Sequence, residues 1–297
     1  MRLNGCRFSA DGRMAAIGCE TNVVLLNVPE QRVVRKLPNW RIAAFTFDPW
    51  DEMLLAAATT GLHRWRIGST QLLETGPVDD ERVFRERGWR AISFSPEGDR
   101  FVAANIHSNA AYVFDRTLTN LVAALGPHPG VDRLAVAPGA RWIATGSTTD
   151  RWLRVWNTAS GMKEFEQAVG AAPDAAFSAD GKWLAAFGGS FTLLETGSWR
   201  TFELPFPHGR PLAGATAFSP DNRLLAVVSD LFDVQLFDLE QWQPVALLRT
   251  PSQAQIYALA FSPDGTRLLA TCEVARLRVW DLSRIRRGLN EIGLDWR

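Results

Sequence analysis

The sequence predicts an all-β fold, a seven-bladed β-propeller, because one short phrase recurs along nearly the whole chain of 297 residues. Each copy is close to Phe-Ser-Pro-Asp-Gly, ends one apolar run and precedes the next. The seven copies begin at Phe8, Phe47, Phe94, Val136, Phe177, Phe218 and Phe261, at intervals of 39, 47, 42, 41, 41 and 43 residues. A period of about 40–45 residues is typical of a four-stranded propeller blade rather than of a helical solenoid.

The repeat divides the chain into seven blades and a tail. The predicted blades cover approximately residues 1–39, 40–88, 89–129, 130–170, 171–212, 213–253 and 254–282. The fourth shows the pattern most clearly, with four short runs at residues 131–136, 141–147, 152–156 and 162–169. Clusters of Gly, Pro, Asp and Ser separate these runs, which predicts an antiparallel meander. In the phrase itself, Pro fixes φ near −65°, Asp hydrogen-bonds to nearby backbone, and Gly accepts positive φ.

The predicted third strand of each blade ends on a bulky residue followed by a polar one. The pairs are Leu26-Asn27, Trp65-Arg66, Phe114-Asp115, Trp156-Asn157, Leu194-Glu195, Phe237-Asp238 and Trp280-Asp281. Sheets that pack face to face bury both of their surfaces, and large aromatic side chains suit such a core. Most of the tryptophans are therefore expected to be core residues.

The last blade is expected to have three strands, because the first apolar run starts almost at Leu3 and leaves no N-terminal residues for a fourth. The tail, residues 283–297, predicts a short helix capped by Ser283 and packing on blade seven. Its apolar face carries Ile285, Leu289 and Ile292, and with Leu294 or Trp296 it is expected to cover the blade's exposed edge. The competing interpretation is that a segment upstream of this sequence completes the blade.

Composition argues against several classes of function. Thirty-two basic and 32 acidic residues give a formal net charge of zero, so no nucleic-acid partner is expected. The four histidines lack metal-ligand spacing, and the sequence has neither a nucleotide-binding loop nor a Gly-x-Ser-x-Gly motif. No catalytic residue, metal or cofactor is therefore predicted. The sequence has no run of 18 apolar residues and no apolar signal-peptide core, so we expect a cytoplasmic monomer without a membrane partner.

These residues resemble the WD-repeat (Trp-Asp repeat) β-propeller family over essentially the whole chain, and Trp280-Asp281 is the literal dipeptide. The fourth blade is the most similar to the family pattern. The resemblance implies that His128, Ser147, Asp150 and Trp156 form a buried hydrogen-bond network that holds this blade together. Gly126-Pro127-His128 stands near the position of the family's Gly-His, and Asp150 at its turn aspartate.

A narrower likeness is to WD-repeat regions of planctomycete-type bacteria, which are often fused to Ser/Thr protein kinases. It depends on the stretch 126–130, on Gly61-Leu62-His63-Arg64-Trp65 and on the C-terminal sequence from Trp280. The chain lacks the Gly-rich loop, His-Arg-Asp and Asp-Phe-Gly motifs of a kinase, so kinase activity is not carried over. The likeness implies an accessory or sensor role related to such signalling proteins.

The favoured function is a non-catalytic scaffold that binds a protein or peptide through loops at the strand ends. Rigid sheets hold variable loops in place, and recognition is often found there. Candidate protein-binding residues stand at the starts of inner strands and nearby: Trp40, Arg41, Arg90, Asp132, Arg133 and Tyr257. The alternatives are the kinase-related accessory role and a propeller enzyme, such as a lactonase-like hydrolase, with its site in the central channel.

Overall fold

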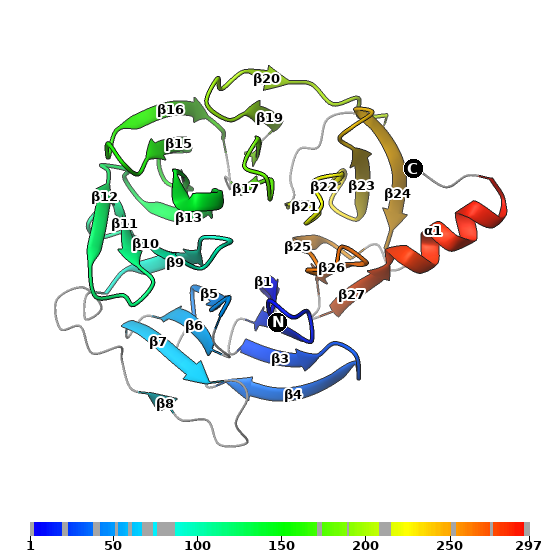
Figure 1. Cartoon of the computed structure of the whole chain (residues 1–297), viewed down its shortest axis with the longest axis horizontal. Helices are drawn as coiled ribbons and strands as arrows, with labels where there is room; N and C mark the ends of the chain where they lie inside the picture. The colour runs from blue at the N-terminus through cyan, green and yellow to red at the C-terminus, as the bar shows by residue number, and fades with distance from the viewer. Residues whose placement is uncertain are drawn as a thin grey trace.

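Seven antiparallel β-sheets surround a central channel in the computed structural model of the protein (Figure 1). The structure describes residues 3–19, 23–37, 42–50, 53–58, 61–66, 74–75, 87–170, 174–188, 190–207, 215–250, 254–273 and 276–293. Within these ranges, six sheets have four strands, the seventh has three, and one helix follows the last strand. This arrangement confirms the predicted seven-bladed propeller with a C-terminal helical tail.

The strands of each blade follow one another from the channel to the rim. In the first four blades they are β1 (Leu3–Phe8), β2 (Met14–Cys19), β3 (Val23–Asn27) and β4 (Arg32–Leu37); β5 (Ala44–Phe47), β6 (Met53–Ala58), β7 (Gly61–Arg66) and β8 (Glu74–Thr75); β9 (Trp89–Phe94), β10 (Arg100–Asn105), β11 (Ala110–Asp115) and β12 (Leu121–Leu125); and β13 (Val131–Val136), β14 (Trp142–Ser147), β15 (Trp152–Asn157) and β16 (Lys163–Ala168).

The last three blades repeat this order. They consist of β17 (Asp174–Phe177), β18 (Trp183–Phe187), β19 (Phe191–Glu195) and β20 (Thr201–Phe202); β21 (Thr216–Phe218), β22 (Leu224–Val228), β23 (Asp233–Asp238) and β24 (Gln243–Arg249); and β25 (Ile256–Phe261), β26 (Arg267–Cys272) and β27 (Arg276–Asp281). A single 3-10 turn, Pro138–Ala140, lies between β13 and β14 in the described part of the chain.

The recurring phrase forms the tight turn between the first two strands of a blade. In blade one, Ser9 Oγ donates to Asp11 Oδ1 at 2.6 Å and accepts from the Met14 N–H at 2.9 Å. Asp11 Oδ1 also accepts from the Arg13 N–H at 3.0 Å, and Gly12 has a φ of +69°. The same bonds recur in three further blades, at Ser178 and Asp180, Ser219 and Asp221, and Ser262 and Asp264. Serine and aspartate are needed because they satisfy backbone N–H groups within the turn.

These turns also contact one another around one mouth of the ring. A Cβ atom placed on Gly181 would lie 3.4 Å from Pro138 Cδ of the preceding blade, so glycine permits this approach. Three hydrogen bonds join neighbouring blades in the same belt: Trp50 Nε1 to Glu97 O at 2.6 Å, Gly139 N to Glu97 Oε2 at 2.9 Å, and Asp180 N to Asn222 Oδ1 at 2.9 Å. The phrase therefore both closes a hairpin and links two blades.

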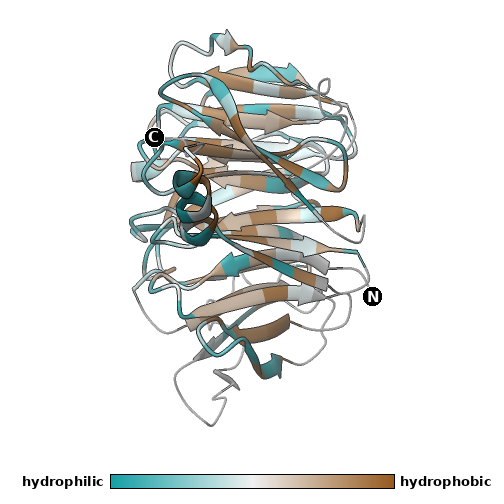
Figure 2. Cartoon of the chain, turned by 90° about the vertical axis from the view of Figure 1, so that its right-hand side faces the viewer, coloured by the Kyte–Doolittle hydropathy of each residue, from teal (hydrophilic) through white to brown (hydrophobic). Residues whose placement is uncertain are grey.

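The hydrophobic core is divided into wedges between neighbouring blades, and hydrophobic and polar residues alternate along many strands (Figure 2). Six of the seven bulky third-strand residues are buried as predicted, each with an exposed fraction of 8% or less: Trp65, Phe114, Trp156, Leu194, Phe237 and Trp280. The seventh, Leu26, is half-buried. The expectation that most tryptophans are core residues was wrong, because only four of the ten described tryptophans are buried and the others stand in turns or at the starts of strands. Among the described residues, the wedge between blades six and seven is the largest, with fifteen buried residues. The main wedge between blades seven and one contains four, Cys6, Ala15, Val28 and Leu269.

Blade seven has three strands, as expected from the sequence. No strand in the described ranges pairs with the outer edge of β27. The helix α1 (Leu282–Glu291) follows directly, and Asp281 caps it by accepting a hydrogen bond from the Arg284 N–H at 2.8 Å. The expectation of a Ser283 cap was wrong, because β27 ends at Asp281 and both the cap and the helix start lie two residues earlier than predicted.

The helix α1 packs against the core between blades six and seven. Ile285 and Leu289 contact this core, whereas Ile292, expected on the same face, is 66% exposed. Leu294 and Trp296 lie outside the described residues. The helix does not fully cover the outer edge of blade seven, because Val279 of β27 remains 40% exposed.

Replacing Gly98 by alanine should destabilise the protein more than the same change at Gly139. Both glycines have positive φ, +72° and +64°, so both variants are strained by about 1–2 kcal/mol. A Cβ at position 98 would also collide with the Trp50 side chain, whereas nothing lies within 4 Å of one at position 139. We expect a total loss of roughly 3 kcal/mol at Gly98, measured by urea unfolding. Equal losses would show that the contact with Trp50 contributes no stability.

The turn aspartates should make stability depend on pH in acid. Hydrogen bonds from Ser9 and Ser262 lower the pKa values of Asp11 and Asp264. A lowered folded pKa stabilises the fold above the unfolded pKa of about 4, and the contribution disappears as pH falls through the folded pKa. The urea midpoint should therefore decrease below about pH 4. The Asp11→Asn/Asp264→Asn double variant should be less stable at neutral pH and less sensitive to acid; parallel pH profiles would contradict this account.

Candidate functional site

Four inner strands carry a β-bulge at the same position of the repeat, four residues before the repeat Phe or its equivalent. Pairing with the second strand skips one residue in each of β1, β9, β13 and β25: Asn4, Arg90, Asp132 and Tyr257. A bulge breaks the regular alternation of side chains and is common beside functional sites. Three of these residues are candidates selected from the sequence, and the Asn4 side chain lies outside the described part of the structure.

The central channel has a volume of about 1520 Å³ and is lined by the inner strands of all seven blades. Arg90, Asp132, Arg133 and Tyr257 all lie in its wall, so the structure brings the four described candidates into one cavity. Arg90 and Arg133 are exposed, and Tyr257 is half-buried. The two other candidates, Trp40 and Arg41, lie outside the described residues.

The channel wall contains two further charged residues that the sequence analysis did not select, Arg7 and Asp174. Burial raises the pKa of the Asp174 carboxyl, and the nearby Arg133 and Arg7 guanidinium groups oppose this shift. These residues stand one and three positions before the repeat Phe, where alternate side chains of an inner strand line the channel. This alternation could have identified Arg7 and Asp174 from the sequence, but the prediction used only the position four residues before Phe.

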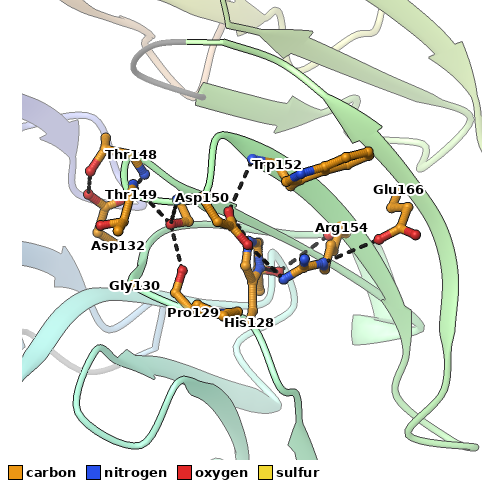
Figure 3. Close-up of polar contacts among 12 residues, drawn as sticks. His128, Pro129, Gly130, Asp132, Thr148, Thr149, Asp150, Trp152, Arg154 and Glu166 are labelled. Atoms are coloured by element: carbon orange, nitrogen blue, oxygen red, sulfur yellow. Dashed lines mark hydrogen bonds and ion pairs between the residues drawn. The ribbon is translucent and has the colours of Figure 1, made fainter.

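The Asp132 carboxylate is held by the loop that joins the second and third strands of blade four (Figure 3). Thr148 Oγ1 donates to Asp132 Oδ2 at 2.6 Å, and the Thr148 N–H donates to Oδ1 at 3.3 Å. Arg133 Nη1 lies 3.7 Å from Asp132 Oδ2. Thr148 and Thr149 also line the channel, so this carboxylate fixes the shape of the mouth beside blade four.

A buried network behind this loop centres on the Thr145 hydroxyl. Trp156 Nε1 donates to Thr145 Oγ1 at 2.7 Å, and His128 Nδ1 lies 2.7 Å from the same oxygen. His128 Nε2 lies 3.3 Å from Asp150 Oδ1, and a carboxylate can only accept. The Nε2 atom therefore carries the proton, and Nδ1 accepts from Thr145. Burial lowers the pKa of His128, and the Arg154 charge acts in the same direction.

The network thus contains His128, Asp150 and Trp156 of the predicted set, but Thr145 supplies the hydroxyl that joins histidine to tryptophan. Ser147, two residues further on, lies at the end of β14, where its Oγ donates to Pro129 O at 2.7 Å. It also accepts from the Asp150 N–H at 3.1 Å. Ser147 therefore connects two loops of the channel mouth.

Asp150 links this network to the outer strand. Its Oδ2 atom lies 3.0 Å from Arg154 Nη1, and Arg154 Nε lies 3.4 Å from Glu166 Oε2 on β16 (Figure 3). The Arg154 side chain is 14% exposed, so this ion pair is shielded from solvent more than most surface pairs are. The inner loops of blade four are in this way connected to its outermost strand.

Within the described ranges, no group of three or more His, Cys, Asp or Glu residues is placed to hold a metal ion. No helix in the same part of the chain is long and apolar enough to cross a membrane.

Comparison with known proteins supports the class of protein that these sheets define. Two segments, residues 119–157 and 242–281, match the family model described as "WD domain, G-beta repeat". With seven blades around a channel, the chain is a seven-bladed β-propeller that contains WD40 repeats.

One particular solved structure of similar fold is hydrazine synthase from Kuenenia stuttgartiensis. Its TM-score is 0.73, over 94% of this chain and 95% of that chain, at 16% sequence identity. An identity this low indicates a shared fold and carries no activity to this chain. A search of curated protein sequences gave no significant match.

Replacing Thr145 by valine should destabilise the protein by about 2–4 kcal/mol, because His128 and Trp156 would each lose a buried hydrogen-bond partner. Thr271→Val is a matched control. Thr271 is fully buried in the equivalent second strand β26, and its hydroxyl has no partner in the described structure. The control should change stability by less than about 0.5 kcal/mol. Chemical unfolding measures both variants, and equal effects would rule out a stabilising role for the Thr145 network.

Proposed function

We propose that this propeller is a non-catalytic scaffold that binds a segment of another protein at the mouth of its central channel. One observation carries the proposal. Three of the four bulges, in blades three, four and seven, bring Arg90, Asp132 and Tyr257 into the wall of one cavity. A cation, an acid and an aromatic ring from separate blades form a mixed surface suited to a peptide.

The residue types support protein recognition. Tyr and Arg are over-represented among the residues that contribute most to protein interfaces. Tyr257 is half-buried and stands on a strand, so little side-chain freedom remains to be lost on binding. Arg90 and Arg133 are exposed and can reach a partner. The hydrogen bonds of Asp132 to Thr148 hold this acid in one orientation before any partner arrives.

The dimensions of the channel also favour a peptide over a small molecule. Small-molecule pockets commonly measure about 300–1,000 Å³, and this channel measures about 1520 Å³. Its described carboxyl groups are Asp132 and Asp174, and Asp132 is already bonded to Thr148. A hydrolase of the lactonase type would need more groups converging on one reacting atom. The enzyme alternative and the kinase-related accessory role stay predictions from the sequence.

Reversing two charges at the mouth tests this proposal. The Arg90→Glu/Arg133→Glu double variant should recover roughly tenfold less of its protein partner than the wild-type chain does, in quantitative affinity capture from the native host. Its Tm should decrease only modestly, because both side chains are exposed and the main loss is the contact of Arg133 with Asp132. Arg200→Glu, at an exposed arginine near the rim of blade five, is the matched control and should capture the partner normally. Equal recovery by all three proteins would exclude the channel mouth as the binding surface.

A further inference from the structure

In the part of the chain that the structure describes, blade seven presents the outer edge of β27 without a fourth strand. Within the described residues, β27 pairs with β26 alone. Figure 1 shows β27 at the rim of the ring, with α1 continuing from its end. Alternate backbone N–H and C=O groups of an edge strand point outward, where another extended segment can pair with them. The edge can therefore accept a strand by β-augmentation.

Val279 shows what such a strand would cover, because 40% of its surface is exposed. Val279 stands one position before the bulky third-strand residue of its blade. In five other blades the equivalent residue has an exposed fraction of 3% or less: Leu25, Val113, Val155, Leu193 and Leu236. Each of those five residues pairs with a residue of a fourth strand. The exposure of Val279 therefore corresponds to the lack of a fourth strand on β27 among the described residues.

In four of these five blades the fourth strand places an apolar residue opposite this position; in blade one the residue there is Arg35. Phe165 lies opposite Val155 and packs against the core between blades four and five. Phe202 lies opposite Leu193 and packs against the core between blades five and six. A segment that binds at β27 would therefore need an apolar residue opposite Val279, where it would enlarge the smallest wedge of the core.

Arg278 adds a requirement for charge. In blade four the equivalent residue, Arg154, pairs directly with Glu166 of the fourth strand, with Nε and Oε2 3.4 Å apart. Arg278 is half-buried and has no acidic partner in the part of the chain that the structure describes. A carboxylate on the incoming strand would supply that partner, and such charge-assisted hydrogen bonds are stronger than neutral ones.

The charge of the rim distinguishes between the candidate occupants. Residues 276–293 contain five arginines and two acidic residues. Two copies of this rim would repel each other if their edge strands paired, since like charges on adjacent strands are unfavourable. An acidic segment would instead be attracted. The charge therefore favours a different, acidic protein over a second copy of this chain.

We propose that an extended acidic segment of another protein binds as the fourth strand of blade seven. It places an apolar residue opposite Val279 and an aspartate or glutamate opposite Arg278. The segment runs antiparallel to β27, as β16 runs antiparallel to β15 in blade four. This edge and the channel mouth consist of different residues, so either proposal can fail without the other.

A fluorescein-labelled peptide with the sequence of residues 161–170 is a suitable probe. It contains β16 and so carries Phe165 and Glu166 in the register that β27 requires. Fluorescence anisotropy should show saturable binding to the intact protein. Hydrogen exchange of the outward amides of β27 should slow when the peptide is added.

Two variants of the edge and one control test the predicted contacts. Val279→Glu should weaken peptide binding about tenfold or more, because it removes apolar contact and adds a negative charge. Arg278→Glu should weaken it similarly, and a peptide with the change Glu166→Arg should restore binding to this variant. Val122→Glu, at a 46% exposed valine on the outer strand of complete blade three, should bind the peptide as the wild type does.

Four results would overturn the proposal. The first is no binding of the peptide, and the second is equal binding by the Val279→Glu variant. The third is slow exchange of the outward β27 amides in the free protein, which would mean that a segment of this chain already occupies the edge. The fourth is a concentration-dependent dimer that the Val279→Glu change abolishes, which would make a second copy the occupant.

Discussion

The turn between the first and second strands is the constraint on which the rest of this propeller depends. Serine and aspartate satisfy its backbone groups, and glycine leaves room for the neighbouring blade. The same few residues therefore determine both the hairpin within a blade and the contact between blades. By contrast, the buried third-strand position accepts Trp, Phe or Leu, because it needs only a bulky apolar side chain.

The residues that hold the blades together are therefore different from those that line the channel mouth. The starts of the inner strands are not involved in the turn belt, so their residues are free to differ from blade to blade. Bulges at Arg90, Asp132 and Tyr257 place these differences in the channel wall. Behind them, Thr145 and Ser147 hold the loops of blade four in position. Recognition at such a mouth would use variable side chains on rigid strands.

The sequence predicted the blade count and the three-stranded last blade, because both follow from local repeats and short-range pairing. The sequence was less informative where two nearby residues of the same type could each make a given hydrogen bond. Thr145 and Ser147 are small hydroxyl residues two positions apart, and only the packed strand shows which one reaches Trp156. Local sequence patterns also could not predict that Arg7 and Asp174 lie in the same channel wall, since ring closure brings together strands far apart in the chain.

Closure itself depends on side chains at one junction. In the described structure, no strand of blade seven pairs with a strand of blade one, and the small set of buried residues includes Cys6 and Leu269. A ring with six larger wedges and one small one has a seam, and we expect native-state opening to begin there. A segment bound at the outer edge of β27, next to this junction, would oppose that opening by mass action. Binding at the β27 edge and the stability of the closed propeller are then thermodynamically linked.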